Sequence, residues 1–268
     1  MRPSPRCSIL GVLITPTDYR SATDAIVAAA RAQRPFTVAA LAVHGVMTGA
    51  LDATHRYRLN RLDLLTPDGQ PVRWALRWLH GVRLPDRVYG PELMRQVCAR
   101  AATEGLSVYL YGSDADTLAA LQTALSATHS NLRIAGVRPS RFRPATAAEW
   151  AEDIATIRAA APDIIFCGLG CPRQEMWVYE MREELARPLV AVGAAFPLLA
   201  GRVPMAPAWM QRAGLEWAFR LAQEPRRLWR RYLIYNPIFL GGLALQICGW
   251  QRCTRPDQAS PIPAKHWS

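Results

Sequence analysis

The sequence predicts an α/β fold: a Rossmann-like, mostly parallel sheet covered by helices, followed by a basic helical C-terminal appendage. Apolar runs of strand length alternate with helix-like stretches between residues 8 and 192, an order that is typical of parallel sheets. The runs are apolar at successive positions, as at 164–167, which predicts strands buried on both faces. Arginine becomes frequent after Gly201, and this change in composition predicts the appendage.

Short apolar runs predict seven strands, at residues 8–14, 36–43, 62–66, 106–111, 133–137, 163–167 and 189–192. Helix-like patterns between them predict six helices, at residues 21–33, 71–79, 91–103, 113–128, 146–160 and 172–186. Capping residues mark two of the helix starts. Ser113 precedes Asp114 and Asp116, and Thr146 precedes Glu149 at the spacing of a capping box.

The composition is that of a folded protein, because 50% of the 268 residues are hydrophobic and 20% are charged. Six cysteines without a paired Cys-x-x-Cys spacing exclude a disulfide scaffold and argue against a structural zinc site. Free thiols of this kind suit a reducing compartment. The apolar run at 9–14 is too short for a secretory signal, so none is expected.

The net charge is +11, and Lys265 is the one lysine among 32 basic residues. Arginine binds phosphate with two parallel hydrogen bonds, so partners that carry phosphates are worth testing: nucleic acid, a nucleotide or an anionic lipid. Nine arginines lie between residues 202 and 255, and the acidic residues in this segment are Glu216 and Glu224. We therefore expect three parts, an α/β catalytic domain at 1–201, a basic amphipathic, membrane-associating appendage at 202–255 and a disordered tail at 256–268.

Asp68 and Gly69 follow the strand at 62–66 and precede a helix. The carboxyl ends of strands line the ligand crevice of open α/β sheets, so Asp68 is a candidate general base. Asp-Gly is also ordinary turn chemistry, and the pattern alone favours the turn.

A second motif follows the strand at 163–167. Gly168 and Gly170 would let a phosphate approach the backbone, and a helix that begins at Pro172 would direct its N–H groups and positive dipole end toward the phosphate. A tight turn is an equally good interpretation, because the third glycine of the dinucleotide fingerprint is absent. The next three residues could bind the charge and hydroxyls of a ligand: Arg173, Gln174 and Glu175.

Other chemistry-bearing residues are less specific. Asp114 and Asp116 mimic a metal-binding Asp-x-Asp, but both lie in an expected first helical turn, behind Ser113 as cap. No metal site is therefore predicted, and no cofactor is expected. His44 follows a strand, so it could reach the same crevice as Asp68, although a buried structural histidine is more common. Two thiols are expected to pack rather than react: Cys167 and Cys171.

Arginine and tryptophan interleave in the appendage, which suits a phosphate-rich, amphipathic partner better than a merely solvated basic face. Residues 232–251 carry no charge, but Asn236 and Pro237 predict a helix start there. The remaining helix, 238–250, is about 20 Å long and too short for a hydrocarbon core of about 30 Å. We expect it to lie on the membrane surface. The residues expected to contact a diphosphate or the membrane are Arg220, Arg226, Arg227, Arg230 and Arg231.

Taken together, several blocks resemble the bacterial WecG/TagA/CpsF glycosyltransferase family (glycosyltransferase family 26), in family order from about residue 9 to 232. These blocks are Asp68-Gly69, Gly90-Pro91, Leu93-Met94, Leu110-Tyr111-Gly112, Gly168 to Glu175, Ala200-Gly201-Arg202, Ala206-Pro207, Gly214-Leu215-Glu216-Trp217 and Arg227 to Tyr232. The resemblance implies a metal-independent, inverting enzyme that transfers a hexose from a UDP-sugar donor to a polyprenyl-diphosphate-linked saccharide at the cytoplasmic face of the inner membrane. Such an enzyme would be peripheral and would serve exopolysaccharide or other cell-surface polysaccharide assembly.

The same resemblance implies roles for particular residues. Asp68 matches the catalytic base and Gln174 a donor-binding residue, while arginines within 220–231 match those near the donor diphosphate and the membrane. Other residues expected around the donor are His44, Gly168, Gly170, Arg173, Glu175 and Arg202. The family's Thr-x-Asn is replaced here by Ala40-Leu41-Ala42, so both a glucosyl and an N-acetylmannosamine-type donor stay open. A homo-oligomer is possible. No nucleic-acid partner is expected, because the sequence contains no recognisable nucleic-acid-binding module. A basic nucleic-acid-binding protein and a Rossmann-type oxidoreductase stay open as alternative function classes.

Overall fold

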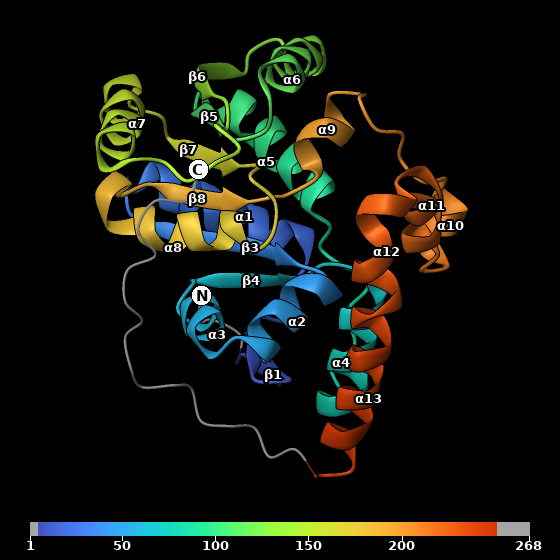
Figure 1. Ribbon diagram of the computed structural model, residues 1–268. Coiled ribbons are helices and arrows are strands. Elements are labelled where there is room, and N and C mark those ends of the chain that lie inside the picture. The colour runs from blue at the N-terminus through green and yellow to red at the C-terminus, as the bar shows by residue number, and fades with distance from the viewer. Residues whose placement is uncertain (1–4, 251–268) are drawn as a thin grey trace.

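The computed structural model describes residues 5–250, apart from the side chains of Arg227 and Arg231. A six-stranded sheet forms the centre of the molecule, in the order β4-β3-β8-β7-β5-β6, and every neighbouring pair in it is parallel (Figure 1). Its strands are β3 (Phe36–Leu41), β4 (Leu64–Pro67), β5 (Ser107–Tyr111), β6 (Arg133–Arg138), β7 (Ile164–Cys167) and β8 (Pro188–Ala191). The predicted α/β class and parallel sheet are therefore confirmed.

Helices cover both faces of the sheet, and each face has its own hydrophobic core. Successive residues of β7 show why: Ile164 and Phe166 point into one core, while Ile165 and Cys167 point into the other. The first core lies under α1 (Tyr19–Arg31), α5 (Gly90–Glu104), α6 (Ala115–Thr128) and α9 (Ala195–Leu199). The second lies under α2 (Val43–Leu51), α3 (Ala53–Asn60), α4 (Gln70–His80), α7 (Ala147–Ala160) and α8 (Arg173–Leu185).

The basic C-terminal segment is helical, as predicted, with α10 (Ala208–Arg212), α11 (Glu216–Gln223), α12 (Pro225–Leu233) and α13 (Tyr235–Ile247). These helices run down one side of the molecule, and α13 packs beside α4 and α2 (Figure 1, right). Phe239 and Leu243 of α13 are buried. Gln246 accepts a hydrogen bond from the Leu10 N–H (2.9 Å) and donates one to the Ser8 carbonyl (3.1 Å), which ties α13 to the N-terminal hairpin.

Two predictions near the N-terminus were wrong. The expected strand at 8–14 is an antiparallel hairpin outside the main sheet, formed by β1 (Cys7–Ile9) and β2 (Val12–Ile14). Leu10 and Gly11 both have positive φ (51° and 87°), as a two-residue hairpin turn requires. The expected strand at 36–43 ends at Leu41, so His44 lies in the first turn of α2. Neither α2 nor α3 was predicted.

The helix caps were predicted with mixed success. The Thr146–Glu149 capping box is confirmed, with both of its hydrogen bonds present (3.2 and 2.8 Å). Ser113 is not a cap, because its φ of 64° places it before the helix. Asp114 caps α6 itself, since its carboxylate accepts hydrogen bonds from the Thr117 N–H and hydroxyl, both at 2.7 Å. The predicted start at Asn236-Pro237 was also displaced, because α13 already begins at Tyr235.

The expected division at residue 201 stays a prediction. The predicted disordered tail, 256–268, lies outside the described residues, as do residues 251–255 at the end of the expected appendage.

Candidate active site

A cavity of about 830 Å³ opens where the carboxyl ends of β3, β4, β5, β7 and β8 meet the C-terminal helices. This volume and position are typical of small-molecule sites in α/β proteins. The cavity brings together ten of the residues singled out from the sequence: His44, Asp68, Gly168, Gly170, Arg173, Gln174, Glu175, Arg202, Arg220 and Arg230. Arg226 is exposed and lies outside its lining, and the side chains of Arg227 and Arg231 are outside the described part.

Asp68 lies directly after β4, where its N–H donates to the Leu41 carbonyl (3.1 Å). Its carboxylate accepts a long hydrogen bond from the Gly90 N–H (3.5 Å). Burial raises the pKa of Asp68 to about 6, against the opposing effect of Arg87, while Glu216 raises it further. A carboxylate with a pKa near neutrality is mostly ionised at pH 7 and still basic enough to accept a proton in a reaction.

Two buried residues that the sequence analysis did not assign to the site, Arg87 and Glu216, line the cavity together with Asp68. Arg87 comes from the segment between α4 and α5, and its Nη2 donates to Glu216 Oε2 at 2.5 Å. The Arg87 guanidinium also lies over the Tyr89 ring, 4.4 Å from its centre. Arg87 carries no local pattern that could have revealed it, because its partner is 129 residues further along the chain.

Gln174 is buried at the start of α8, and the neighbouring Glu175 fixes the orientation of its amide. Gln174 Nε2 donates a hydrogen bond to Glu175 Oε1 (2.7 Å). Gln174 Oε1 is then a buried acceptor without a hydrogen-bond partner among the described residues. Because buried acceptors are rarely left unpaired, this oxygen is suited to a ligand hydroxyl or N–H.

The two positions before α8, Gly168 and Gly170, require glycine for different physical reasons. A Cβ atom at Gly168 would come within 2.6 Å of the Phe196 ring, so this position must be small. Gly170 has a φ of +82°, a left-handed backbone conformation that favours glycine, with no atom crowding it. Arg173 is held back toward this loop by a hydrogen bond to the Leu169 carbonyl (3.2 Å). The loop therefore presents backbone and a guanidinium to the cavity.

The other predicted residues occupy the walls and rim. His44 stacks on the Tyr235 ring of α13, with ring centres 5.3 Å apart. Arg202 is exposed at the rim and donates to the Asp116 carbonyl (3.3 Å). Arg220 has its Nε buried without a hydrogen-bond partner among the described residues, and Arg230 lines the cavity from α12. Positive side chains thus reach the cavity from several directions.

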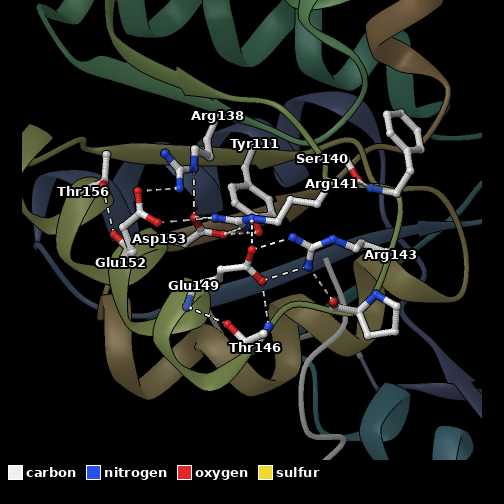
Figure 2. A network of polar contacts seen from close by, with 12 residues as sticks. Tyr111, Arg138, Ser140, Arg141, Arg143, Thr146, Glu149, Glu152, Asp153 and Thr156 are labelled. Carbon is white, nitrogen blue, oxygen red and sulfur yellow. Dashed lines mark hydrogen bonds and ion pairs between the residues drawn. The ribbon is translucent and has the colours of Figure 1, made fainter.

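A polar network centred on the buried Asp153 supports the wall of the cavity beside β6 (Figure 2). Asp153 accepts hydrogen bonds from the Tyr111 hydroxyl (2.9 Å), from Arg138 Nε (2.8 Å) and from both terminal nitrogens of Arg141 (2.7 and 2.9 Å). Four charge-assisted or neutral donors on one carboxylate hold the chain after β6 in place. That chain brings two residues to the cavity: Ser140 and Phe142.

Among residues 5–250, no group of three or more histidine, cysteine or acidic side chains is arranged to hold a metal ion. Cys167 is fully buried, and burial raises the pKa of its thiol. Cys171 lines the cavity, 3.8 Å from the Thr48 hydroxyl.

The sequence profile of the Glycosyl transferase WecG/TagA/CpsF family matches residues 7–252. A curated relative from Bacillus subtilis (strain 168), an N-acetylglucosaminyldiphosphoundecaprenol N-acetyl-beta-D-mannosaminyltransferase, is 31% identical over 176 residues. The match covers 65% of this chain and 66% of the relative, so just under two thirds of the relative's length is spanned. Because the profile covers nearly the whole chain, this protein belongs to the WecG/TagA/CpsF family of glycosyl transferases.

Proposed function

We propose that the protein is an inverting glycosyltransferase that moves a hexose from a UDP-sugar to a polyprenyl-diphosphate-linked saccharide, in the assembly of a bacterial exopolysaccharide or other cell-surface polysaccharide. The observation that carries the proposal is Asp68, a carboxylate with a pKa of about 6 in a cavity lined by arginines. The relative's name, which specifies a diphosphoundecaprenol-linked sugar and a mannosaminyl transfer, supports this substrate class.

In this reaction an acceptor hydroxyl attacks the anomeric carbon of the donor from the face opposite UDP. The new C–O bond forms as the bond to the β-phosphate oxygen breaks, and UDP leaves with the electron pair. Asp68 takes the hydroxyl proton. The charge that develops on the diphosphate is stabilised by the arginines of the cavity and by the backbone N–H groups near the start of α8.

The identity of the sugar depends on the end of β3. Ala40 and Ala42 line the cavity there, and the Ala42 Cβ lies 3.9 Å from where a side chain at Gly69 would begin. Two methyl groups beside Asp68 offer no hydrogen bond to a polar substituent of the sugar, which leaves glucose and N-acetylmannosamine-type donors as candidates. The decisive experiment is incubation with a panel of UDP-sugars and a lipid-diphosphate-linked acceptor, with product masses measured. No product from any UDP-sugar would reject the proposed function.

Gln174 should contribute to donor binding. Replacing it with leucine removes the unpaired Oε1 acceptor, and the loss of one or two hydrogen bonds is expected to raise the donor KM roughly tenfold. The matched control is Gln96→Leu, since Gln96 makes a similar hydrogen bond to Glu92 (2.8 Å) but does not line the cavity. Steady-state kinetics with varied donor would measure both. Equal donor KM values in the two variants would remove Gln174 from the donor site.

Transfer should not require a divalent metal. Asp114 is engaged in capping α6, and Asp116 lies in the first turn of that helix, so neither is poised as a metal ligand. Arginines that line the cavity would take the role of a cation beside the diphosphate. We expect the initial rate to be unchanged in excess EDTA. A rate that collapses in EDTA and returns with magnesium or manganese would contradict this assignment.

We further propose that the protein attaches to the cytoplasmic leaflet of the inner membrane as a peripheral protein. No helix within the described range is both long and apolar enough to span a bilayer. Exposed apolar side chains occur on α12, on α13, at the residue between them and on the adjacent α4: Trp229, Leu233, Ile234, Ile238, Leu240, Leu245, Trp74 and Trp78. The exposed arginines of α12 include Arg226 and Arg230. Exposed apolar and cationic side chains on neighbouring helices suit an anionic bilayer.

A further inference from the structure

A buried ion pair joins the C-terminal helices to the segment beside Asp68. Arg87 lies between α4 and α5, Glu216 is the first residue of α11, and their side chains are 8% and 12% exposed. Arg87 Nη2 is 2.5 Å from Glu216 Oε2, and it also donates to Gln211 Oε1 at 3.3 Å. Charges this far from water are stable only when paired, so each partner holds the other in position.

Asp68, Arg87 and Glu216 line the same cavity. The two members of the pair act on Asp68 in opposite directions. The positive charge of Arg87 favours the ionised form of Asp68 and lowers its pKa, whereas the negative charge of Glu216 raises it. Three further groups face Asp68: Tyr19 from α1, Tyr89 from the segment between α4 and α5, and Arg220 from α11. Burial raises the pKa of both tyrosines, so they stay neutral at pH 7. Arg220 lowers the pKa of Asp68, but less than Arg87 does.

We propose that Glu216 is a positioning residue for the transfer reaction: by pairing with Arg87 it offsets the guanidinium charge beside Asp68 and keeps that carboxylate a competent base. This inference rests on the proposed function, in which Asp68 accepts the proton of the acceptor hydroxyl. Without Glu216, the charge of Arg87 would stabilise the Asp68 carboxylate, and a more stable carboxylate is a weaker base.

The test is the pH dependence of kcat/KM in a double-mutant cycle. Glu216→Gln should move the acid limb of the profile to lower pH by roughly one unit, because Arg87 is left uncompensated. Arg87→Gln should move it to higher pH, since Glu216 then acts alone. The double variant carries neither charge, and its acid limb should return toward that of the wild-type protein. An acid limb that stays at the wild-type pH in Glu216→Gln would overturn the proposal.

Breaking a buried ion pair could also act by loosening the fold, and Glu180→Gln controls for this. Glu180 pairs with the buried Arg58 (3.4 Å) between α3 and α8, outside the cavity lining. This variant should lose stability without moving the acid limb. If Glu216→Gln fails to fold, Arg87→Gln is compared with the double variant instead. The proposal requires the acid limb of Arg87→Gln to lie at higher pH than that of the double variant. Acid limbs at the same pH would reject it.

Carboxyl ¹³C NMR separates this inference from the proposed function. The Asp68 resonance is assigned by its loss in Asp68→Asn, and its titration is followed in the wild-type protein and in Glu216→Gln. A titration midpoint that moves to lower pH in Glu216→Gln supports the role of Glu216. If sugar transfer is absent at the same time, the proposed function alone is rejected. Sugar transfer together with an unmoved midpoint would reject the role of Glu216.

Discussion

Asp68→Asn is expected to lower kcat by about 100-fold or more, which is the scale of a lost general base. Asparagine keeps the shape of the side chain and an oxygen for the Gly90 N–H, but it cannot take up a proton. Because the remaining lining of the cavity is untouched, the donor KM should change little. Initial rates with the lipid-linked acceptor, read by product mass, would measure the effect. A turnover near that of the wild-type protein would exclude Asp68 as the base.

The pH profile of the wild-type protein provides a second test of the same residue. The base must be ionised, and the pKa of Asp68 is about 6, so kcat/KM should fall as the pH drops below about 6. The free energy of unfolding should change with pH in the opposite direction. The pKa of Asp68 is higher in the folded protein than its ordinary value of 3.8, so ionisation costs stability as the pH rises from about 4 through about 6.

Asp68→Asn removes that cost and should therefore melt no lower than the wild-type protein at pH 7.5. The matched control is Asp63→Asn at the opposite, amino end of the same strand. Asp63 accepts hydrogen bonds from the Thr37 N–H (2.8 Å) and hydroxyl (2.7 Å) and does not line the cavity. Asparagine keeps an acceptor oxygen there but loses the charge that strengthens both hydrogen bonds, so the melting temperature should fall while kcat is unchanged. These opposite outcomes would separate a catalytic carboxylate from a structural one.

Removal of all residues after Ala222 is expected to abolish binding to anionic liposomes and most activity on the lipid-linked acceptor. The truncation deletes α12 and α13, and with them Arg226, Arg230 and the exposed apolar side chains outside α4. Flotation with anionic and with neutral liposomes would measure binding. Unchanged flotation of the truncated protein would exclude this segment from membrane contact. Resistance of the full chain to carbonate extraction would contradict a peripheral attachment.

Because Phe239 and Leu243 of α13 are buried against the body, the truncation also removes part of the core. Leu233→Ser and Ile238→Ser avoid this problem, since the two side chains are 58% and 46% exposed. Each should weaken liposome binding by roughly tenfold, the free energy of one apolar side chain that enters the bilayer surface. Activity on a short-chain, water-soluble acceptor should be retained. Loss of that activity would indicate damage to the site rather than to membrane attachment.

Local patterns were sufficient for most of the fold. The parallel sheet could be predicted because strands such as β7 are apolar at every position, and a strand buried on both faces needs helices on both sides. The Thr146–Glu149 capping box could be predicted because its two hydrogen bonds join residues three apart. The hairpin at 8–14 was missed because an apolar run does not reveal that Leu10 and Gly11 adopt positive φ.

Within the site, the chain by itself determined the residues that follow strand ends. Asp68 and the loop from Gly168 to Glu175 are adjacent in sequence to apolar runs, so their place at the carboxyl edge of the sheet follows from local order alone. The tertiary structure alone decided what surrounds them. Arg87 and Glu216 are 129 residues apart, and each is an ordinary charged residue until folding buries both beside Asp68. Proton affinity depends on burial and on charges a few ångströms away, and these are properties of the packed chain rather than of its order.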